Sequence, residues 1–226
     1  MKALEELKDR LRATVVLCFL LLSLEVAFAE RPTRVACVGD SITYGFGIGS
    51  REEKSYPAQL QGLLGDPWIV GNFGKNGATV LKKGHAPYWK APQYRAALKF
   101  QPDVVIIALG TNDSRPENIG KQRENFVPDY LDLIRSFRSL ESKPVVWICR
   151  PVPIYVTRKG MTDAVLRNEI IPLVDEVAKQ AGIEVIDFYK VLSHRKEMFP
   201  YGVHPDAAGA GRIAEAVVAA ITKEDR

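Results

Sequence analysis

The sequence has few of the residues that build metal sites or covalent cross-links. Three cysteines and three histidines occur among its 226 residues, and no His/Cys/Asp cluster has the spacing of metal ligands. We therefore expect neither a metal nor another cofactor. Cys37 and Cys149 lie inside apolar, strand-like runs, where cysteine behaves as a small hydrophobe. Two buried thiols are expected there, and no disulfide.

Basic charge is neither large nor clustered. The formal net charge is +4, and the lysines and arginines are scattered along the chain, which argues against a nucleic-acid partner. A glycine-rich stretch at residues 45–49 lacks the Lys-Ser/Thr of a phosphate-binding loop and does not open directly into a helix. We interpret that stretch as a flexible rim of a ligand cleft.

The sequence also lacks an apolar run long enough to cross a bilayer, which takes about 20 residues. Ala13–Leu24 is a mostly apolar run, preceded by the charged segment Lys2–Arg12 and followed by small residues at Ala27–Ala29. This is the layout of a secretory signal. We expect residues 1–29 to be a signal peptide, with an uncleaved anchor as the alternative. Residues 30–226 are expected to form one domain, secreted or periplasmic, with no membrane span once the signal is removed.

Apolar runs of strand length alternate with segments of helical length through residues 30–226. The expected strands are 34–39, 68–72, 104–109, 145–149 and 184–186. The expected helices are 56–64, 93–100, 121–140, 163–181 and 206–221. This alternation predicts a three-layer α/β/α domain with a five-stranded parallel sheet. Pro128 and Pro172 are expected to bend the helices that contain them.

Polar loops follow strands or strand-like segments at four points, around Ser41, Gly77, Asn112 and His204. Because the carboxyl ends of parallel strands meet at one edge, these loops are expected to converge on one site. Acyl transfer needs a nucleophile, a base and donors to the developing oxyanion. Ser41 fits the nucleophile and His204 the base, while the backbone N–H groups of Ser41 and Gly77 and the Asn112 amide fit the donors. The alternative for Ser41 is a simple helix N-cap.

The same segments resemble a known family. Gly39-Asp40-Ser41, residues 76–79, residues 110–113 and residues 203–205 look like the four conserved blocks of SGNH (GDSL-type) hydrolases. The resemblance covers the whole expected mature domain. It implies a flavodoxin-like fold and ester hydrolysis through an acyl-enzyme, with the four residues in the roles given above.

One position departs from this pattern. The last block of the family is Asp-x-x-His, in which the Asp orients the histidine, whereas Tyr201 stands three residues before His204. Three interpretations follow. A backbone carbonyl orients the histidine of a Ser–His dyad, or another carboxylate takes the place of the Asp. In the third, the protein is inactive or is a variant of an active parent. Asp206 and Asp187 are the candidate substitutes, although Asp206 suits a helix cap and Asp187 a turn at a strand end.

A compact domain with a signal peptide resembles carbohydrate O-acetylesterases more than lipases. We therefore expect short-chain ester substrates, O-acetyl groups on carbohydrate first. Lysophospholipase or thioesterase activity and a non-catalytic carbohydrate-binding pseudoenzyme are the alternatives. Aromatic rings interleaved with arginines suit a sugar, and the side chains expected to line the cleft are Tyr88, Trp89, Arg150, Tyr155, Arg158 and Tyr201. His85 and His194 are interpreted as surface or loop histidines.

Overall fold

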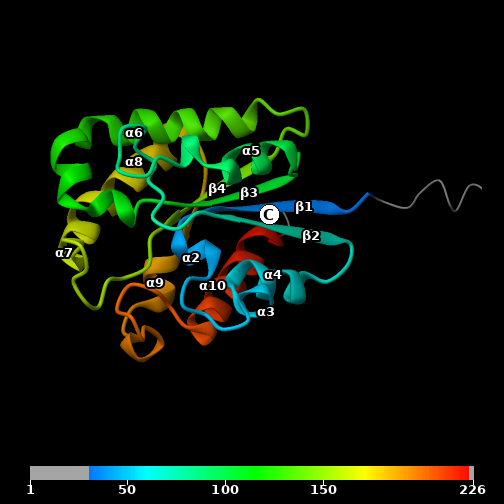
Figure 1. Cartoon of the computed structure of the whole chain (residues 1–226). Helices are drawn as coiled ribbons and strands as arrows, with labels where there is room; N and C mark the ends of the chain where they lie inside the picture. The colour runs from blue at the N-terminus through cyan, green and yellow to red at the C-terminus, as the bar shows by residue number, and fades with distance from the viewer. Residues whose placement is uncertain (1–30, 224–226) are drawn as a thin grey trace, which may run out of the picture. The chain divides into compact units, whose positions relative to one another are not determined.

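The computed structural model describes residues 31–223 (Figure 1). The expected signal peptide, residues 1–29, lies outside the described residues. Of the helices within residues 31–223, none combines the length and the hydropathy that crossing a bilayer requires.

A five-stranded, entirely parallel sheet forms the centre of the domain. Its strands are β1 Thr33–Gly39, β2 Trp68–Gly74, β3 Val104–Ala108, β4 Val145–Arg150 and β5 Val185–Asp187. They lie in the order β2-β1-β3-β4-β5, which is the flavodoxin-like order. The predicted sheet is confirmed. Its strand ends differ by one or two residues, and β2 extends furthest beyond prediction because it pairs with β1 as far as Gly74.

Helices cover both faces of the sheet (Figure 1). One face carries α5 Pro92–Lys99, α6 Pro116–Arg138 and α8 Ile171–Ala181. The other carries α4 Tyr56–Leu64, α9 Phe188–Leu192 and α10 Ala207–Ile221. The short elements are α2 Ser41–Tyr44, α3 Arg51–Lys54, α7 Asp163–Val165, η1 Tyr88–Lys90, η2 Asn112–Ser114, the π-helical turn η3 Leu166–Ile170 and η4 Lys196–Met198.

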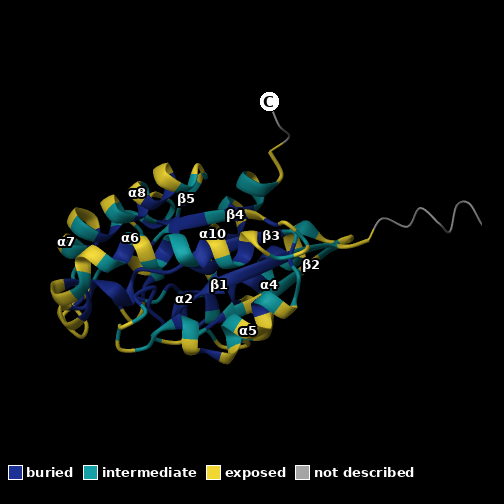
Figure 2. Ribbon diagram, turned by 90° about the horizontal axis from the view of Figure 1, so that it is seen from above, coloured by how far each residue is buried: buried dark blue, intermediate teal, exposed yellow. Residues whose placement is uncertain are grey.

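Two apolar cores form because successive side chains of a strand point to opposite faces. On β1, Ala36 and Val38 enter the core under α6 and α8, while Val35 and Cys37 enter the core under α4 and α10. Figure 2 shows β1 as buried along most of its length. Cys37 and Cys149 are free and buried, on β1 and β4 with β3 between them, as the sequence predicts.

Both expected helix bends need correction in position. In α6 the backbone leaves helical dihedrals at Gln122 (φ −142°, ψ 23°) and not at Pro128, and the Gln122 side-chain amide donates to the Lys83 carbonyl. The segment expected as one helix over 163–181 is divided by η3, and Pro172 stands in the first turn of α8. Because η3 runs directly into α8 with helical dihedrals at Ile170, the position without an N–H, Pro172, coincides with the change from π-type to α-type hydrogen bonding.

Candidate functional site

Ser41 occupies the sharp turn between β1 and α2. An added side chain at Gly39 would come within 2.7 Å of the Ala108 carbonyl on β3, so this approach requires glycine. Asp40 caps α2, because its Oδ1 accepts a hydrogen bond of 2.9 Å from the Ile42 N–H. The N-cap role that was the alternative for Ser41 therefore belongs to Asp40.

The Ser41 hydroxyl contacts the imidazole of His204, with 2.8 Å between Oγ and Nε2. His204 stands two residues before Asp206, the N-cap of α10. The ring of Phe46 packs against the imidazole with 4.7 Å between ring centroids. When Nε2 accepts the Ser41 proton, the ring proton is on Nδ1. Nδ1 is buried, and no hydrogen-bond partner for it exists among the described residues.

The imidazole is consequently a weak base. Burial, and secondarily the positive charge of Arg158, lowers the pKa of His204 to about 4. A carboxylate on Nδ1 would oppose both effects by stabilising the imidazolium. The ring is therefore neutral at pH 7 and able to accept a proton, but with less driving force than an ordinary histidine has.

We expect an NMR titration of the His204 Hε1 resonance to show a midpoint near pH 4. Because the pKa is lowered, the neutral form persists as the pH falls through the range where an unperturbed histidine, with a pKa of about 6.5, becomes charged. The resonance is identified by its absence from His204→Gln. The same protein in denaturant is the control and should titrate at about 6.5. A folded-state midpoint between about 6 and 7 would contradict the prediction.

Gly77 lies in the loop that follows β2. The Lys75 N–H donates to the Gly39 carbonyl at 2.9 Å, which ties the start of this loop to the end of β1. Gly77 has a φ of +78°, a conformation that side-chain-bearing residues rarely adopt. The loop thereby presents Gly77 to the same pocket as Ser41.

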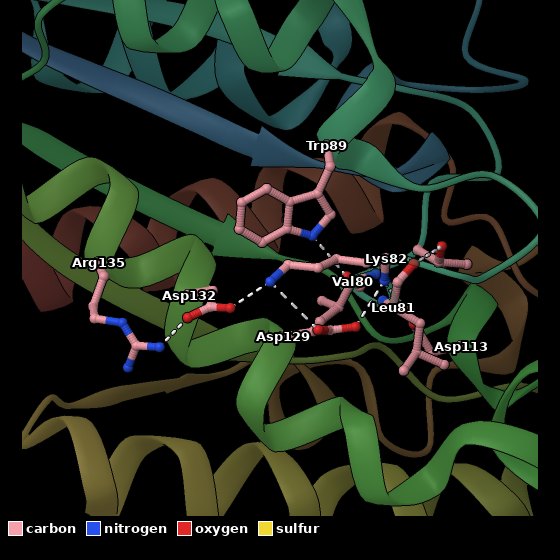
Figure 3. A network of polar contacts seen from close by, with 9 residues as sticks. Val80, Leu81, Lys82, Trp89, Asp113, Asp129, Asp132 and Arg135 are labelled. Atoms are coloured by element: carbon pink, nitrogen blue, oxygen red, sulfur yellow. Dashed lines mark hydrogen bonds and ion pairs between the residues drawn. The ribbon is translucent and has the colours of Figure 1, made fainter.

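Asp113 fixes the chain beyond Gly77 to the turn that follows β3. Its carboxylate is fully buried and accepts from the N–H groups of Val80, at 3.1 Å, and Leu81, at 3.0 Å (Figure 3). Burial raises the pKa of Asp113 to about 7 despite these two donors. The Gly77 loop and the Asn112 turn are thus held together by one side chain.

The next residues of the same segment are anchored on α6. The Lys82 N–H donates to Asp129 at 2.8 Å, and its ammonium forms ion pairs with Asp129 and Asp132 (Figure 3). The ammonium lies 4.7 Å from the centroid of the Trp89 ring, and the Trp89 indole donates to the Val80 carbonyl at 3.0 Å. These contacts make the 80–89 segment part of the rigid scaffold.

Asn112 follows β3 and faces the turn after β1. Its Nδ2 donates to Asp40 Oδ2 at 3.1 Å, and its Oδ1 accepts from the Arg115 guanidinium at 3.4 Å. These contacts set the amide orientation and leave Nδ2 a second hydrogen to donate. β1 and β3 are neighbours where the strand order reverses, which is where open parallel sheets bind ligands.

The four residues expected at the site line one pocket of about 310 Å³. Ser41, Gly77, Asn112 and His204 all contribute to its wall. The other lining residues are Phe46, Asn76, His85, Ala86, Thr111, Arg115, Arg158, Lys159, Met161 and Val203. Phe46 belongs to the glycine-rich stretch expected at the rim of the cleft, and Arg158 was also expected there.

His85 lies in an exposed loop, as the sequence indicated, and this loop also places it in the pocket wall, which the sequence did not indicate. The segment after Leu81 folds back so that Pro87 bridges to Thr79, and the ring Nδ1 lies 2.9 Å from the Asn118 amide nitrogen. The sequence could have shown only that His85 closely follows the Gly77 loop. Arg115, Lys159 and Met161 were also missed, because no motif marks them.

Trp89, Arg150 and Tyr155 were expected in the cleft and are not among the residues that line the pocket. Trp89 packs on Lys82 as described above. Arg150 forms ion pairs with Asp175 and Asp187. The Tyr155 hydroxyl donates to the Leu192 carbonyl and accepts from the Arg195 N–H. Their polar groups are thus engaged in structural contacts, and Tyr88 likewise donates its hydroxyl to the Phe73 carbonyl.

Among residues 31–223, no substitute for the missing acid is bonded to His204. Asp206 caps α10 by accepting from the Gly209 N–H at 2.9 Å. Asp187 caps α9 through the Lys190 N–H at 2.8 Å and pairs with Arg150. Because Nδ1 has no acceptor within residues 31–223, neither a carboxylate nor a backbone carbonyl orients the ring. Tyr201 itself is 54% exposed.

The described residues give no sign of a metal centre. Within residues 31–223, His, Cys, Asp and Glu side chains do not gather in the groups of three or more that could hold an ion.

Comparisons with known proteins point to one family. The model of the GDSL-like lipase/acylhydrolase family matches residues 37–212. An acetylxylan esterase of Xylanibacter ruminicola is 40% identical in an alignment 210 residues long that covers 85% of this chain and 44% of that protein. The chain thus spans less than half of that relative's length.

Solved structures share the fold. A carbohydrate acetylesterase family member from Sinorhizobium meliloti superposes with a TM-score of 0.67 and 23% identity, over 84% of this chain and 97% of that one. The aryl esterase of M. smegmatis superposes with a TM-score of 0.67 and 17% identity, over 84% and 98%. At these identities the likeness supports the fold alone.

Proposed function

Since the chain belongs to the GDSL-like lipase/acylhydrolase family, we propose that it is a serine esterase that removes O-acetyl groups from carbohydrate. The observation that carries the proposal is the contact of 2.8 Å between Ser41 Oγ and His204 Nε2 in a pocket that Gly77 and Asn112 also line. The carbohydrate part rests on the 40% identity to an acetylxylan esterase. Export of the protein is proposed from the layout of residues 1–29.

The proposed reaction has two halves. Ser41 Oγ attacks the acetyl carbonyl while His204 Nε2 takes the hydroxyl proton, and the N–H groups of Ser41 and Gly77 and the Asn112 amide donate to the oxyanion. The carbon–oxygen bond to the sugar breaks, and His204 returns the proton to the leaving sugar hydroxyl. Water then attacks acetyl-Ser41 with His204 again as the base. The bond between the acetyl carbon and Ser41 Oγ breaks, His204 returns its proton to Ser41, and acetate is released.

The orphaned Nδ1 of His204 limits the rate of this cycle. As each imidazolium forms, its Nδ1–H has no acceptor, so the protein does not stabilise the new charge. The two groups that the structure shows against the imidazole, the Ser41 hydroxyl and the ring of Phe46, carry no charge. We propose a working but slow dyad.

The test is hydrolysis of p-nitrophenyl acetate by the protein and by Ser41→Ala. We expect the variant to lose about 10² in kcat. In a serine protease, removing the serine lowers kcat about 70-fold more than removing the acid does, and this protein already lacks the acid. Ser139→Ala, a change at an exposed serine at the end of α6, is the matched control and should keep the full rate. Equal rates for the protein and Ser41→Ala, both at the buffer background, would overturn the proposal.

A non-catalytic carbohydrate-binding protein is the second candidate. It is favoured by the same observation that limits the rate, the absence of an acceptor for Nδ1. A fluorophosphonate separates the two candidates, because it labels a serine that an adjacent base activates. Labelling that disappears in Ser41→Ala supports the esterase, and a protein that resists labelling while binding sugar supports the second candidate.

A further inference from the structure

The wall of the Ser41 pocket carries an excess of positive charge. Arg115, Arg158 and Lys159 all line it, and among the described lining residues none is Asp or Glu. The buried carboxyl group of Asp40 accepts a hydrogen bond from Asn112 and does not itself line the pocket. The ligand that enters this pocket therefore meets three cations beside the nucleophile.

Arg115 is the most telling of the three, because a buried cation needs compensation. Its residue is 9% exposed, and its Nε has no hydrogen-bond partner among the described residues. The guanidinium reaches the neutral Asn112 amide at 3.4 Å, and its ion pair with Glu117 is long, at 3.8 Å. The protein thus leaves the charge of Arg115 only partly balanced.

Arg158 and Lys159 are brought to the same wall by a tight turn. The Arg158 N–H and the Met161 carbonyl close this turn at 3.3 Å, with Lys159 and Gly160 at φ values of 52° and 74°. An added Cβ at Gly160 would lie 2.7 Å from Pro116 Cδ, so the turn rests on the residue next to Arg115. Neither cation forms an ion pair within residues 31–223.

The charges of all three side chains are felt inside the pocket. The charge of Arg158 contributes to lowering the pKa of His204. Burial, with contributions from the charges of Arg115 and Lys159 that Glu117 partly opposes, lowers the pKa of His85, whose ring lies near Gly77. The three cations thus act on the space between the two imidazoles, where a substrate would lie.

We propose that Arg115, Arg158 and Lys159 form an anion subsite that selects sugar esters bearing a carboxylate, such as an O-acetylated uronic acid. This inference rests on the proposed function for its reaction. The planar fork of a guanidinium matches a carboxylate with two parallel hydrogen bonds. A sulfate or phosphate group shares this charge, so the experiment includes a sulfated sugar.

The experiment compares mono-O-acetylated methyl glucoside with mono-O-acetylated methyl glucuronide, which differ only in the carboxylate. Acetate release by the full protein should favour the glucuronide by about 10-fold in kcat/KM, since a favourable charge contact is worth about 1.4 kcal/mol here. Arg158→Gln should reduce this ratio several-fold. Arg95→Gln, the same change on an exposed face of α5 away from the pocket, should leave the ratio intact.

Binding separates failure of the subsite from failure of the esterase. Methyl glucuronide, methyl glucoside and methyl glucoside 6-sulfate are titrated by NMR into the protein and Arg158→Gln. If no acetate is released but the glucuronide binds more tightly and Arg158→Gln removes the difference, the subsite stands and the esterase fails. If the protein releases acetate from both esters with equal kcat/KM and binds the two methyl glycosides equally, the subsite is overturned. Tighter binding of the sulfate than of the glucuronide overturns selection for a carboxylate.

Discussion

Tyr201→Asp raises kcat for p-nitrophenyl acetate by about 10³ to 10⁴, because removing the acid from a serine protease triad costs about 10⁴. The Nδ1 of His204 is buried without an acceptor, and a carboxylate at this position would supply one. It would also stabilise the imidazolium and so raise the pKa of His204 from about 4. The base then gains strength in the step that limits the reaction.

The structure allows this change at little cost. Tyr201 is 54% exposed, and its ring packs over Gly47, where an added Cβ would lie 2.8 Å from the ring. Loss of that ring removes no buried polar contact and leaves the core untouched. An Asp three residues before the histidine is also the arrangement that the family resemblance implies.

The control separates charge from space. Tyr201→Asn opens the same volume and offers an amide that can orient the ring, but it cannot stabilise the imidazolium, so we expect less than a tenth of the gain in kcat. Tyr201→Phe tests the hydroxyl and should match the parent. Equal kcat values for the Asp and Asn variants would show that the missing carboxylate is not what limits the protein.

The site could be predicted to the extent that a parallel sheet dictates it. Ser41 and Asn112 closely follow the buried strands β1 and β3, and parallel strands end at one edge of the sheet whatever the loops do. The parallel sheet alone does not predict that His204 lies close to Ser41, because this depends on how α10 packs against the sheet. Motif resemblance supplied that part.

The pocket wall was harder to predict, because its loops are placed by side-chain contacts far apart in sequence. His85 enters the pocket because its segment donates hydrogen bonds to Asp113 in η2 and to Asn118 in α6. Arg150 lies outside the pocket because its guanidinium forms ion pairs with Asp175 and Asp187. A residue type suited to sugar binding does not reveal such pairings, so the residues of the wall were predicted poorly.

Asn112→Ala lowers kcat by about 10² to 10³ with little change in KM, the loss seen when one side-chain donor of an oxyanion hole is removed. Asn112 Nδ2 is held by Asp40 Oδ2 at 3.1 Å, so its second hydrogen is aimed before the substrate arrives. A donor of this kind acts on charge that develops in the transition state, and binding of the neutral ester is therefore spared.

This prediction is best measured on the Tyr201→Asp background. If the parent exceeds its Ser41→Ala variant by only about 10², a loss of that size would take Asn112→Ala to the background, where kcat and KM cannot be separated. Asn125→Ala, a change at a half-buried asparagine on α6 that does not line the pocket, is the matched control. Asn112→Asp should be at least as slow as Asn112→Ala, since a carboxylate would face both Asp40 and the oxyanion. If Asn112→Ala raises KM and leaves kcat unchanged, Asn112 is a contact for bound substrate. The oxyanion would then depend on the Ser41 and Gly77 N–H groups.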